Sequence, residues 1–317
     1  MKTDFRRKFW LMAVLATGLA MSITANAASD TTNNIDPLRF GQRAADEAFG
    51  AFQRGLYKTA LNLALDRASK GDAAAQTLAA EIYARGLGTG QNLPEAARLY
   101  NLAAEKGIPE AQFQAALFLI EGKTGPKDKQ KAKAYLEKAV AGNHTLAAFN
   151  LAQLILSDAT TNEQKKPAFD LFLRAANTGL ADAQYAVSQF LANGTGGVPF
   201  DEAQARIWLE KAARQNYDTA QLDLGSWLVD GIGGKKDYEA GFLWTKRAAE
   251  IGNIEAQRRL AHLYEDGIGN NGDQIAAAAW YVIARRAGLH DKALDNHLDG
   301  LTPEELKKAI EMANRLK

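Results

Sequence analysis

Residues that could carry acid–base or metal chemistry are few in this chain of 317 residues. The histidines are His144, His262, His290 and His297. His290 and His297 are close enough in sequence to share a metal ion, but only if both rings face the same way. We interpret this pair as surface histidines, and we predict neither a metal site nor a catalytic residue.

Thiol and phosphate chemistry are also poorly represented. The sequence contains no cysteine, which excludes disulfides, thiolate nucleophiles and cysteine-ligated metals. The glycine-rich stretch 194–197 follows a predicted helix, not a strand, and lacks the lysine of a phosphate-binding loop. Catalysis needs a convergent set of activated groups. We therefore expect no cofactor, and a hydrolase acting on cell-wall or β-lactam substrates is the less favoured alternative.

The charges are nearly balanced, with 38 Lys and Arg against 37 Asp and Glu. This balance argues against nucleic acid or an anionic membrane as the partner. One stretch is locally basic, and it contains Lys123, Lys127, Lys129, Lys131, Lys133 and Lys138. We interpret it as a solvated loop and helix face, with docking of an acidic polymer or partner as the alternative.

The N-terminus has the three regions of a secretory signal peptide. A positive start is followed by an apolar run over 9–23, and residues 25–27 have the small-x-small form of a cleavage site. Arg6 and Arg7 leave a twin-arginine export route open. We predict cleavage after Ala27 and a periplasmic mature chain if the host is a Gram-negative bacterium. No later stretch is apolar enough to span a bilayer, so we expect no membrane insertion of the mature chain.

The most regular feature of the sequence is a two-residue motif that recurs in steps of 36 or 37 residues. It consists of an alanine followed by Gln or by another small or apolar residue, at Ala75, Ala111, Ala147, Ala183, Ala220, Ala256 and Ala293. A Gly or Asn closes each unit, at Gly71, Gly107, Gly142, Gly179, Asn216, Gly252 and Gly288. Self-similarity of this length indicates a stacked repeat protein, in which no unit buries its apolar face alone.

One unit, residues 217–252, shows how each repeat is built. Apolar residues recur at helical spacing in its first half, which predicts a first helix. The glycines within 231–234 end that helix, and Asp237 is placed to cap a second helix that continues to Gly252. Gly225 has no side chain, which predicts a close approach by a neighbouring helix.

Aromatic and apolar residues align at two adjacent positions of the second helices. Eight residues before the closing residue stand Leu99, Ala134, Leu171, Trp208, Trp244 and Trp280. Seven residues before it stand Tyr100, Tyr135, Phe172, Leu209, Thr245 and Tyr281. We predict that both positions pack in the core between the second helices of adjacent repeats.

The pattern resembles the Sel-one-like repeat family, whose units are related to tetratricopeptide repeats. The residues that carry the resemblance include Ala220-Gln221, Leu224-Gly225, Gly231-Ile232-Gly233, Asp237 and Ala248-Ala249, with matching sets in the neighbouring units. The resemblance implies an all-α fold, a right-handed α-α superhelix or solenoid that wraps a partner or scaffolds an assembly.

The resulting organisation has five parts. We expect a signal peptide at 1–27, a disordered leader at 28–37, a tetratricopeptide-like unit at 38–71, six Sel-one-like repeats at 72–288 and C-terminal capping helices at 289–317. Thr302 and Pro303 are placed to start the last helix. Residues 157–167 lack the glycine turn, which predicts an altered bend in the third repeat.

First helices line the concave face of such solenoids, and the residue after the Gln position tends to point into it. That column consists of Phe113, Phe149, Tyr185, Leu222 and Arg258. Two interpretations stay open for it: packing against the next repeat, which the family pattern favours, and partner binding, for which these five residues are the candidates. The expected function is a non-catalytic scaffold or adaptor in the periplasm, binding another envelope protein or peptide segment. A regulator of a sensor kinase and a scaffold for polysaccharide export are the alternatives.

Overall fold

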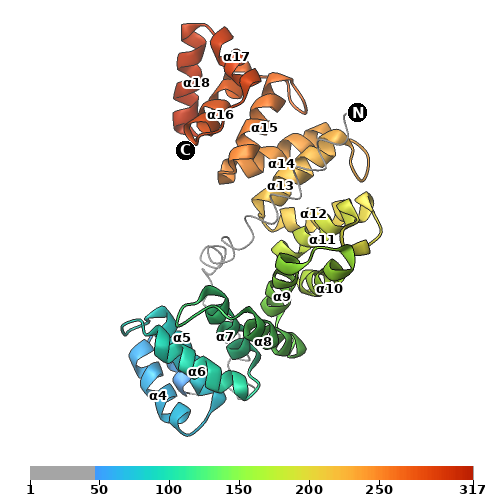
Figure 1. Ribbon diagram of the computed structural model, residues 1–317. Coiled ribbons are helices and arrows are strands. Elements are labelled where there is room, and N and C mark those ends of the chain that lie inside the picture. The colour runs from blue at the N-terminus through green and yellow to red at the C-terminus, as the bar shows by residue number, and fades with distance from the viewer. Residues whose placement is uncertain (1–46, 317) are drawn as a thin grey trace. The chain divides into compact units, whose positions relative to one another are not determined.

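The computed structural model describes residues 47–316, and the predicted signal peptide and leader lie outside them. The described residues form sixteen α-helices and one short 3-10 helix, with no strand among them (Figure 1). The predicted all-α fold is therefore confirmed. Within the same residues, no helix is both long enough and apolar enough to cross a membrane.

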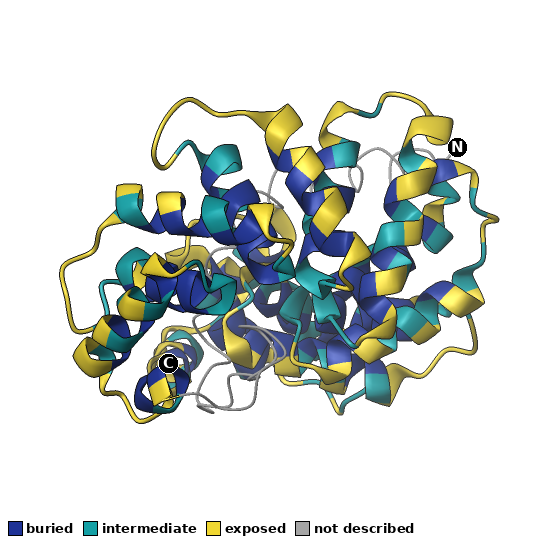
Figure 2. Ribbon diagram, turned by 90° about the horizontal axis from the view of Figure 1, so that it is seen from below, coloured by how far each residue is buried: buried dark blue, intermediate teal, exposed yellow. Residues whose placement is uncertain are grey.

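The chain divides into two compact units between residues 159 and 160. The first unit contains α3 (Glu47–Gln53), α4 (Tyr57–Ser69), α5 (Ala73–Arg85), α6 (Leu93–Glu105), α7 (Pro109–Glu121), α8 (Lys129–Ala141) and α9 (Thr145–Asp158). The second contains α10 (Asn162–Asn177), α11 (Ala181–Asn193), η2 (Thr195–Gly197), α12 (Glu202–Arg214), α13 (Asp218–Asp230), α14 (Tyr238–Ile251), α15 (Ile254–Glu265), α16 (Gln274–Arg286), α17 (Lys292–Gly300) and α18 (Pro303–Arg315). Most helices carry a buried stripe on one side and exposed residues on the other (Figure 2).

Polar side chains start the second helix of most repeats. Backbone N–H groups of the first turn donate to the cap residues Asn92, Asp128, Asp201, Asp237 and Asp273. The predicted cap at Asp237 is confirmed, because its Oδ1 accepts from the Ala240 N–H at 2.9 Å. Thr302 caps α18 in a reciprocal arrangement with Glu305. Such caps satisfy backbone donors that have no partner inside the helix.

A buried glutamine ties each of five first helices to the second helix before it. The side-chain amide donates to a carbonyl eight residues earlier at 3.0 to 3.3 Å. The pairs are Gln76 with Ala68, Gln112 with Ala104, Gln184 with Ala176, Gln221 with Ala213, and Gln257 with Ala249. A buried amide must be hydrogen-bonded to avoid a desolvation penalty. This bond explains why Gln follows Ala in the recurring motif.

Two glycines allow neighbouring elements to touch. A Cβ on Gly225 would lie 2.3 Å from the Thr245 hydroxyl, so the close approach of α13 and α14 predicted from the sequence is confirmed. Gly233 has a φ of +68°, and a Cβ there would lie 2.3 Å from the Glu202 carbonyl oxygen. The turn after α13 can therefore rest against the start of α12 only if this residue is glycine.

The two aligned positions of the second helices differ in burial. The position seven residues before the closing residue is buried in all six repeats. The position before it is buried at Leu99 and Trp280, but it is exposed at Ala134 and only partly buried at Trp208 and Trp244. The prediction that this whole column is core is therefore wrong. One residue turns a helix by about 100°, which is enough to rotate a side chain from the core to its edge.

Candidate functional site

Phe113, the first member of the predicted column, packs against the next repeat. Its side chain is only 5% exposed, and its ring stacks on the His144 ring with centroids 4.6 Å apart. His144 Nδ1 accepts from the Ala147 N–H at 3.0 Å, and its Nε2 lies 2.9 Å from a carboxylate oxygen of Glu110. The imidazole is thus held on both sides, with Nε2–H as the donor to Glu110.

Tyr185 occupies the equivalent buried position in the second unit. Its hydroxyl donates to Asp223 Oδ2 at 2.9 Å, and its ring lies 5.2 Å from the Tyr217 ring. Burial raises the pKa of Asp223 to about 8, and the hydrogen bond from Tyr185 only partly offsets it. Burial also raises the pKa of Tyr217. Phe113 and Tyr185 therefore pack in the same way: each contacts the residue that precedes the first helix of the next repeat, His144 before α9 and Tyr217 before α13.

The other three column residues are partly exposed. Leu222 packs at the edge of an apolar cluster, while Phe149 is half-buried in the first unit. Arg258 pairs with Glu255 and, through Nη1, with Asp291 Oδ2 at 2.9 Å. Of the five column residues, only these three are partly exposed, whereas Phe113 and Tyr185 are buried.

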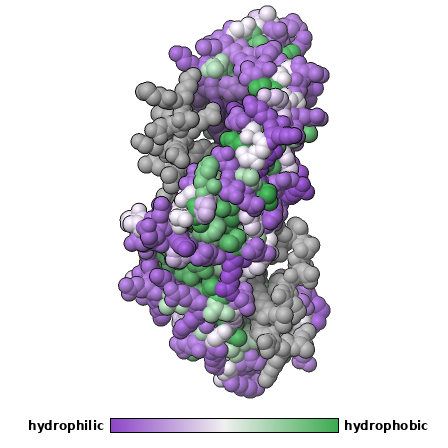
Figure 3. Space-filling view, turned by 90° about the vertical axis from the view of Figure 1, so that its right-hand side faces the viewer, coloured by the Kyte–Doolittle hydropathy of each residue, from purple (hydrophilic) through white to green (hydrophobic). Residues whose placement is uncertain are grey.

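A second surface in the second unit exposes apolar side chains. Ile207 on α12 is 47% exposed and Leu243 on α14 is 55% exposed. They hold the same position in neighbouring repeats, and each precedes a partly buried tryptophan, Trp208 or Trp244. Because they recur at the same position in adjacent repeats, we take these two exposed side chains as a candidate interaction site. On the face shown in Figure 3, hydrophobic areas likewise interrupt a mostly hydrophilic surface.

Cations complete this second surface. Lys211 Nζ lies 3.7 Å from the centroid of the Trp208 ring, and the Arg247 guanidinium carbon lies 5.7 Å from that of Trp244. Arg247 also donates to the Asn216 side chain at 2.8 Å, which links α14 to the end of α12. Cations over tryptophan rings are stabilised by the ring quadrupole. We call this set the α12–α14 surface, and it consists of Ile207, Trp208, Lys211, Leu243, Trp244 and Arg247.

Sequence reasoning missed the α12–α14 surface because it assigned the tryptophans to the core. A signal was present one position earlier in each repeat. There the chain has Arg98, Lys133, Asp170, Ile207, Leu243 and Ala279. Large aliphatic residues replace charged ones at this position in two adjacent repeats only.

Two of the histidines belong to a polar cluster near the C-terminal end. His262 Nε2 lies 3.0 Å from Asp291 Oδ2, and its Nδ1 lies 3.3 Å from Glu265. His297 Nδ1 lies 3.4 Å from the other Glu265 oxygen, and its side chain is 9% exposed, so its interpretation as a surface residue is wrong. Burial would raise the pKa of Asp291, but hydrogen bonds from His262 and Arg258 outweigh it and hold the pKa well below its usual value. Within residues 47–316, no three His, Cys, Asp or Glu side chains are arranged to hold a metal ion.

These features define a helical-repeat protein with two candidate interaction surfaces. Comparison with protein families assigns it more closely: the Sel1 repeat matches residues 73–108, 109–144, 145–180, 181–217, 218–253 and 254–289. The chain belongs to the Sel1 repeat family, and the resemblance inferred from the sequence is confirmed. Sel1 repeat proteins are generally protein–protein interaction scaffolds, and the fold is typically non-catalytic.

Curated relatives are named as regulators. Chitin synthase regulatory factor 3 of Schizosaccharomyces pombe is 29% identical over 217 residues, which are 65% of this chain and 23% of that protein. The chain thus spans less than a quarter of that relative's length. The exopolysaccharide production negative regulator of Rhizobium leguminosarum bv. viciae is 26% identical over 231 residues, 70% of this chain and 75% of that protein.

Two solved structures share the fold. One is a protective antigen of uropathogenic Escherichia coli, with a TM-score of 0.72 and 25% identity, covering 85% of this chain and 61% of that one. The other is a Sel1 repeat protein from Oxalobacter formigenes, with a TM-score of 0.66 and 26% identity, covering 78% of this chain and 99% of that one.

Proposed function

We propose that this chain is a non-catalytic scaffold or adaptor of the periplasm that binds another envelope protein or peptide segment. Family membership supports the scaffold role, and the signal-peptide pattern that ends at Ala27 supports export. N-terminal sequencing of the protein from a periplasmic fraction tests export, with Ala28 expected as the first residue. Recovery of a chain that still begins at Met1 would contradict it.

The observation that carries the proposal is the α12–α14 surface. Binding hot spots are enriched in tryptophan and arginine and are surrounded by contacts that exclude water. Trp208 and Trp244 provide flat apolar area, and the adjacent Ile207 and Leu243 are exposed and free to be covered by a partner. The partly exposed column residues Phe149, Leu222 and Arg258 are the second candidate surface.

The names of the relatives favour a regulatory role connected with polysaccharide. A negative regulator of exopolysaccharide production and a chitin synthase regulatory factor both concern control of polysaccharide synthesis. A regulator of a sensor kinase or a scaffold for polysaccharide export is therefore our second candidate function. Either role requires a protein partner, so the same surface serves both proposals.

Capture of the partner from periplasm tests the proposal. The double variant Ile207→Ser, Leu243→Ser removes the exposed aliphatic side chains and leaves the tryptophans in place. We expect the free energy of unfolding to stay within about 0.5 kcal/mol of the wild-type value, because exposed positions contribute little to stability. We expect the amount of crosslinked partner to fall at least about tenfold.

Leu56→Ser is the matched control, since Leu56 is 51% exposed in the first unit and lies outside the α12–α14 surface. It should retain full capture. If the double variant captures the partner as well as Leu56→Ser does, the α12–α14 surface is not the binding site.

A further inference from the structure

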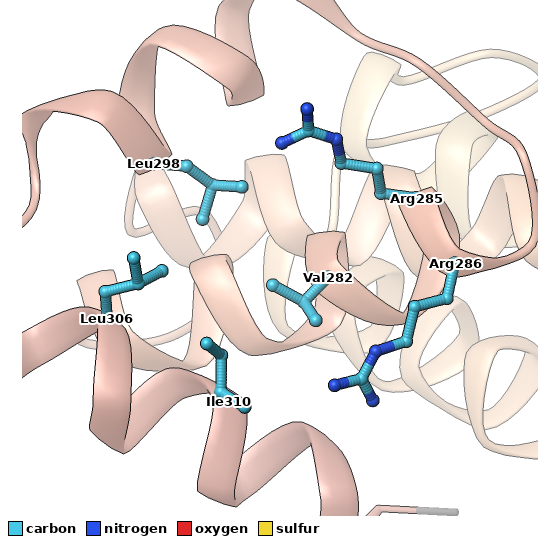
Figure 4. A pocket seen from close by; sticks show the side chains of 6 residues that line it. All are labelled: Val282, Arg285, Arg286, Leu298, Leu306 and Ile310. Carbon is cyan, nitrogen blue, oxygen red and sulfur yellow. The ribbon is translucent and has the colours of Figure 1, made fainter.

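A pocket of about 380 Å³ lies among α16, α17 and α18 (Figure 4). It is lined by Val282, Arg285, Arg286, Leu298, Leu306 and Ile310. Leu298 is buried, Val282 and Leu306 are partly exposed, and Ile310 is 37% exposed. The pocket therefore has an aliphatic floor that solvent can reach. Its volume is at the small end of the roughly 300 to 1,000 Å³ typical of ligand pockets.

The two arginines flank this floor from different sides. Figure 4 shows the Arg285 guanidinium on the side of Leu298 and the Arg286 guanidinium on the side of Ile310, with Val282 between them. The pocket therefore has apolar surface between two separated cations. It matches a ligand with an apolar centre and an anion on each side.

The partners of the arginines leave positive charge available. Arg285 Nη1 lies 3.5 Å from Asp295 Oδ1, an oxygen that also accepts from the Tyr281 hydroxyl at 2.7 Å. Arg286 Nη1 donates to the neutral side chain of Asn314 at 2.9 Å, and no ion pair within residues 47–316 neutralises it. A guanidinium carries five N–H donors. Arg286 thus keeps its charge and most of its donors for a ligand.

Arg285 also departs from the repeat pattern. Three residues before the closing residue, the six repeats have Ala104, Ala139, Ala176, Ala213, Ala249 and Arg285. In four of the first five, the alanine carbonyl accepts from the glutamine of the next repeat. After α16 that glutamine is replaced by the buried Leu294. The end of α16 therefore lacks the alanine and glutamine pair found at the earlier repeats, and it has the exposed cation Arg285 beside the pocket instead.

We propose that this pocket binds a partner polypeptide segment in which an aliphatic side chain is flanked on both sides by carboxylates. The aliphatic side chain would rest on Val282, Leu306 and Ile310, and the carboxylates would accept from Arg285 and Arg286. A fatty acid carries one carboxylate at the end of its chain, so it would place an anion on only one side of the aliphatic floor. A nucleic acid would leave the aliphatic floor uncovered. This inference concerns residues outside the α12–α14 surface and goes beyond the proposed function.

Fluorescence polarisation with the mature chain tests the inference. The probe is a short labelled peptide with a central leucine flanked by glutamates; one twin has glutamines in place of the glutamates, and another has lysines. Octanoate serves as the competing aliphatic carboxylate. We expect saturable binding of the glutamate peptide and at least about tenfold weaker binding of the glutamine twin, because charged hydrogen bonds contribute more than neutral ones.

Substitutions at Arg286 separate binding from folding. Arg286→Gln should weaken the glutamate peptide by at least about tenfold, and Arg286→Glu should reverse the preference in favour of the lysine twin. Arg214→Gln is the matched control, because Arg214 holds the same repeat position on α12, is exposed and lines no part of the pocket. It should bind the glutamate peptide as wild type does. Melting curves of all three variants should coincide with wild type.

Four results would overturn the inference. They are absence of saturable binding of the glutamate peptide at millimolar concentration, equal binding of the glutamate and glutamine peptides, unchanged binding by Arg286→Gln, and binding of octanoate without binding of the peptide. The last result would assign the pocket to a lipid-like carboxylate instead of a polypeptide.

Discussion

Trp244 and Trp280 occupy the same position in neighbouring repeats but have different surroundings. Trp280 is 2% exposed inside an apolar cluster, whereas Trp244 is partly buried under the Arg247 guanidinium. The cost of truncating a side chain grows with the area that it buries and with the cavity that it leaves. Equivalent tryptophans can therefore have different surroundings: Trp280 lies in the core, and Trp244 lies at its edge, where we propose that a partner binds.

The pair gives a direct prediction for stability. Trp280→Ala should lower the free energy of unfolding by about 3 to 5 kcal/mol, the usual cost for a buried large aromatic. Trp244→Ala should cost less, about 1 to 2 kcal/mol, because the side chain lies at the edge of an apolar cluster and is only partly buried. Urea denaturation of both variants measures the difference. Equal losses would show that the burial assigned to Trp244 is wrong.

Asp223 predicts a dependence of stability on pH. Burial raises its pKa to about 8 in the folded protein, against about 3.9 in an unfolded chain. Between these values the folded state holds a proton that the unfolded state has released. The contribution of this group to stability is therefore complete below about pH 4 and is lost as the pH rises through the folded pKa of about 8.

Asp223→Asn tests this dependence because the amide stays neutral and can still accept from the Tyr185 hydroxyl. From pH 5 to pH 8, wild type should lose unfolding free energy relative to the variant. Denaturant titrations at several pH values measure the difference. A difference that stays constant over this range would rule out a raised pKa at Asp223.

At the element scale, helix ends and turns decide how closely the repeats stack. The turn after α13 lies against the start of α12 at Gly233, where both the positive φ and the contact with the Glu202 carbonyl oxygen exclude a side chain. Gly234 differs, because a Cβ there would meet only the flexible end of the Arg206 side chain, at 2.8 Å. Adjacent glycines therefore carry unequal constraints.

Gly233→Ala should destabilise the protein by about 2 kcal/mol or more, because it adds backbone strain to a steric clash. Gly234→Ala should stay within about 1 kcal/mol, since the arginine can move aside. Differential scanning calorimetry of the two variants compares them directly. The account of the turn fails if Gly234→Ala is the more damaging change.

Much of this element structure was predictable from the sequence. The recurring motif, the glycine turn and the cap at Asp237 are local signals, and each has a local physical cause in the structure. Burial is harder to predict for residues at the edge of the buried stripe of a helix, because such residues lie beside core positions but are only partly covered. This is why the sequence pattern predicts core positions for Trp208 and Trp244. Packing against the next repeat is one of the two interpretations that the sequence leaves open for Phe113, and the stacking of its ring on His144 agrees with that interpretation.

At the scale of the whole molecule, the repeat sequence predicts the architecture better than the binding site. Every repeat must bury the same apolar positions, so the core pattern recurs and can be recognised. The binding surfaces that we propose are local departures from that pattern, at Ile207, Leu243 and Arg285. The division into two units falls beside the stretch that lacks a glycine turn, and the altered bend expected there stays a prediction.

Site-specific photo-crosslinking tests the central claim most directly, namely that a protein partner covers the α12–α14 surface. A benzophenone amino acid would replace Ile207, Leu243 or Leu56 in the exported chain, followed by irradiation of intact cells. We predict one crosslinked protein, common to positions 207 and 243 and absent at position 56. Absence of a product at 207 and 243, or an equal product at 56, would contradict the claim.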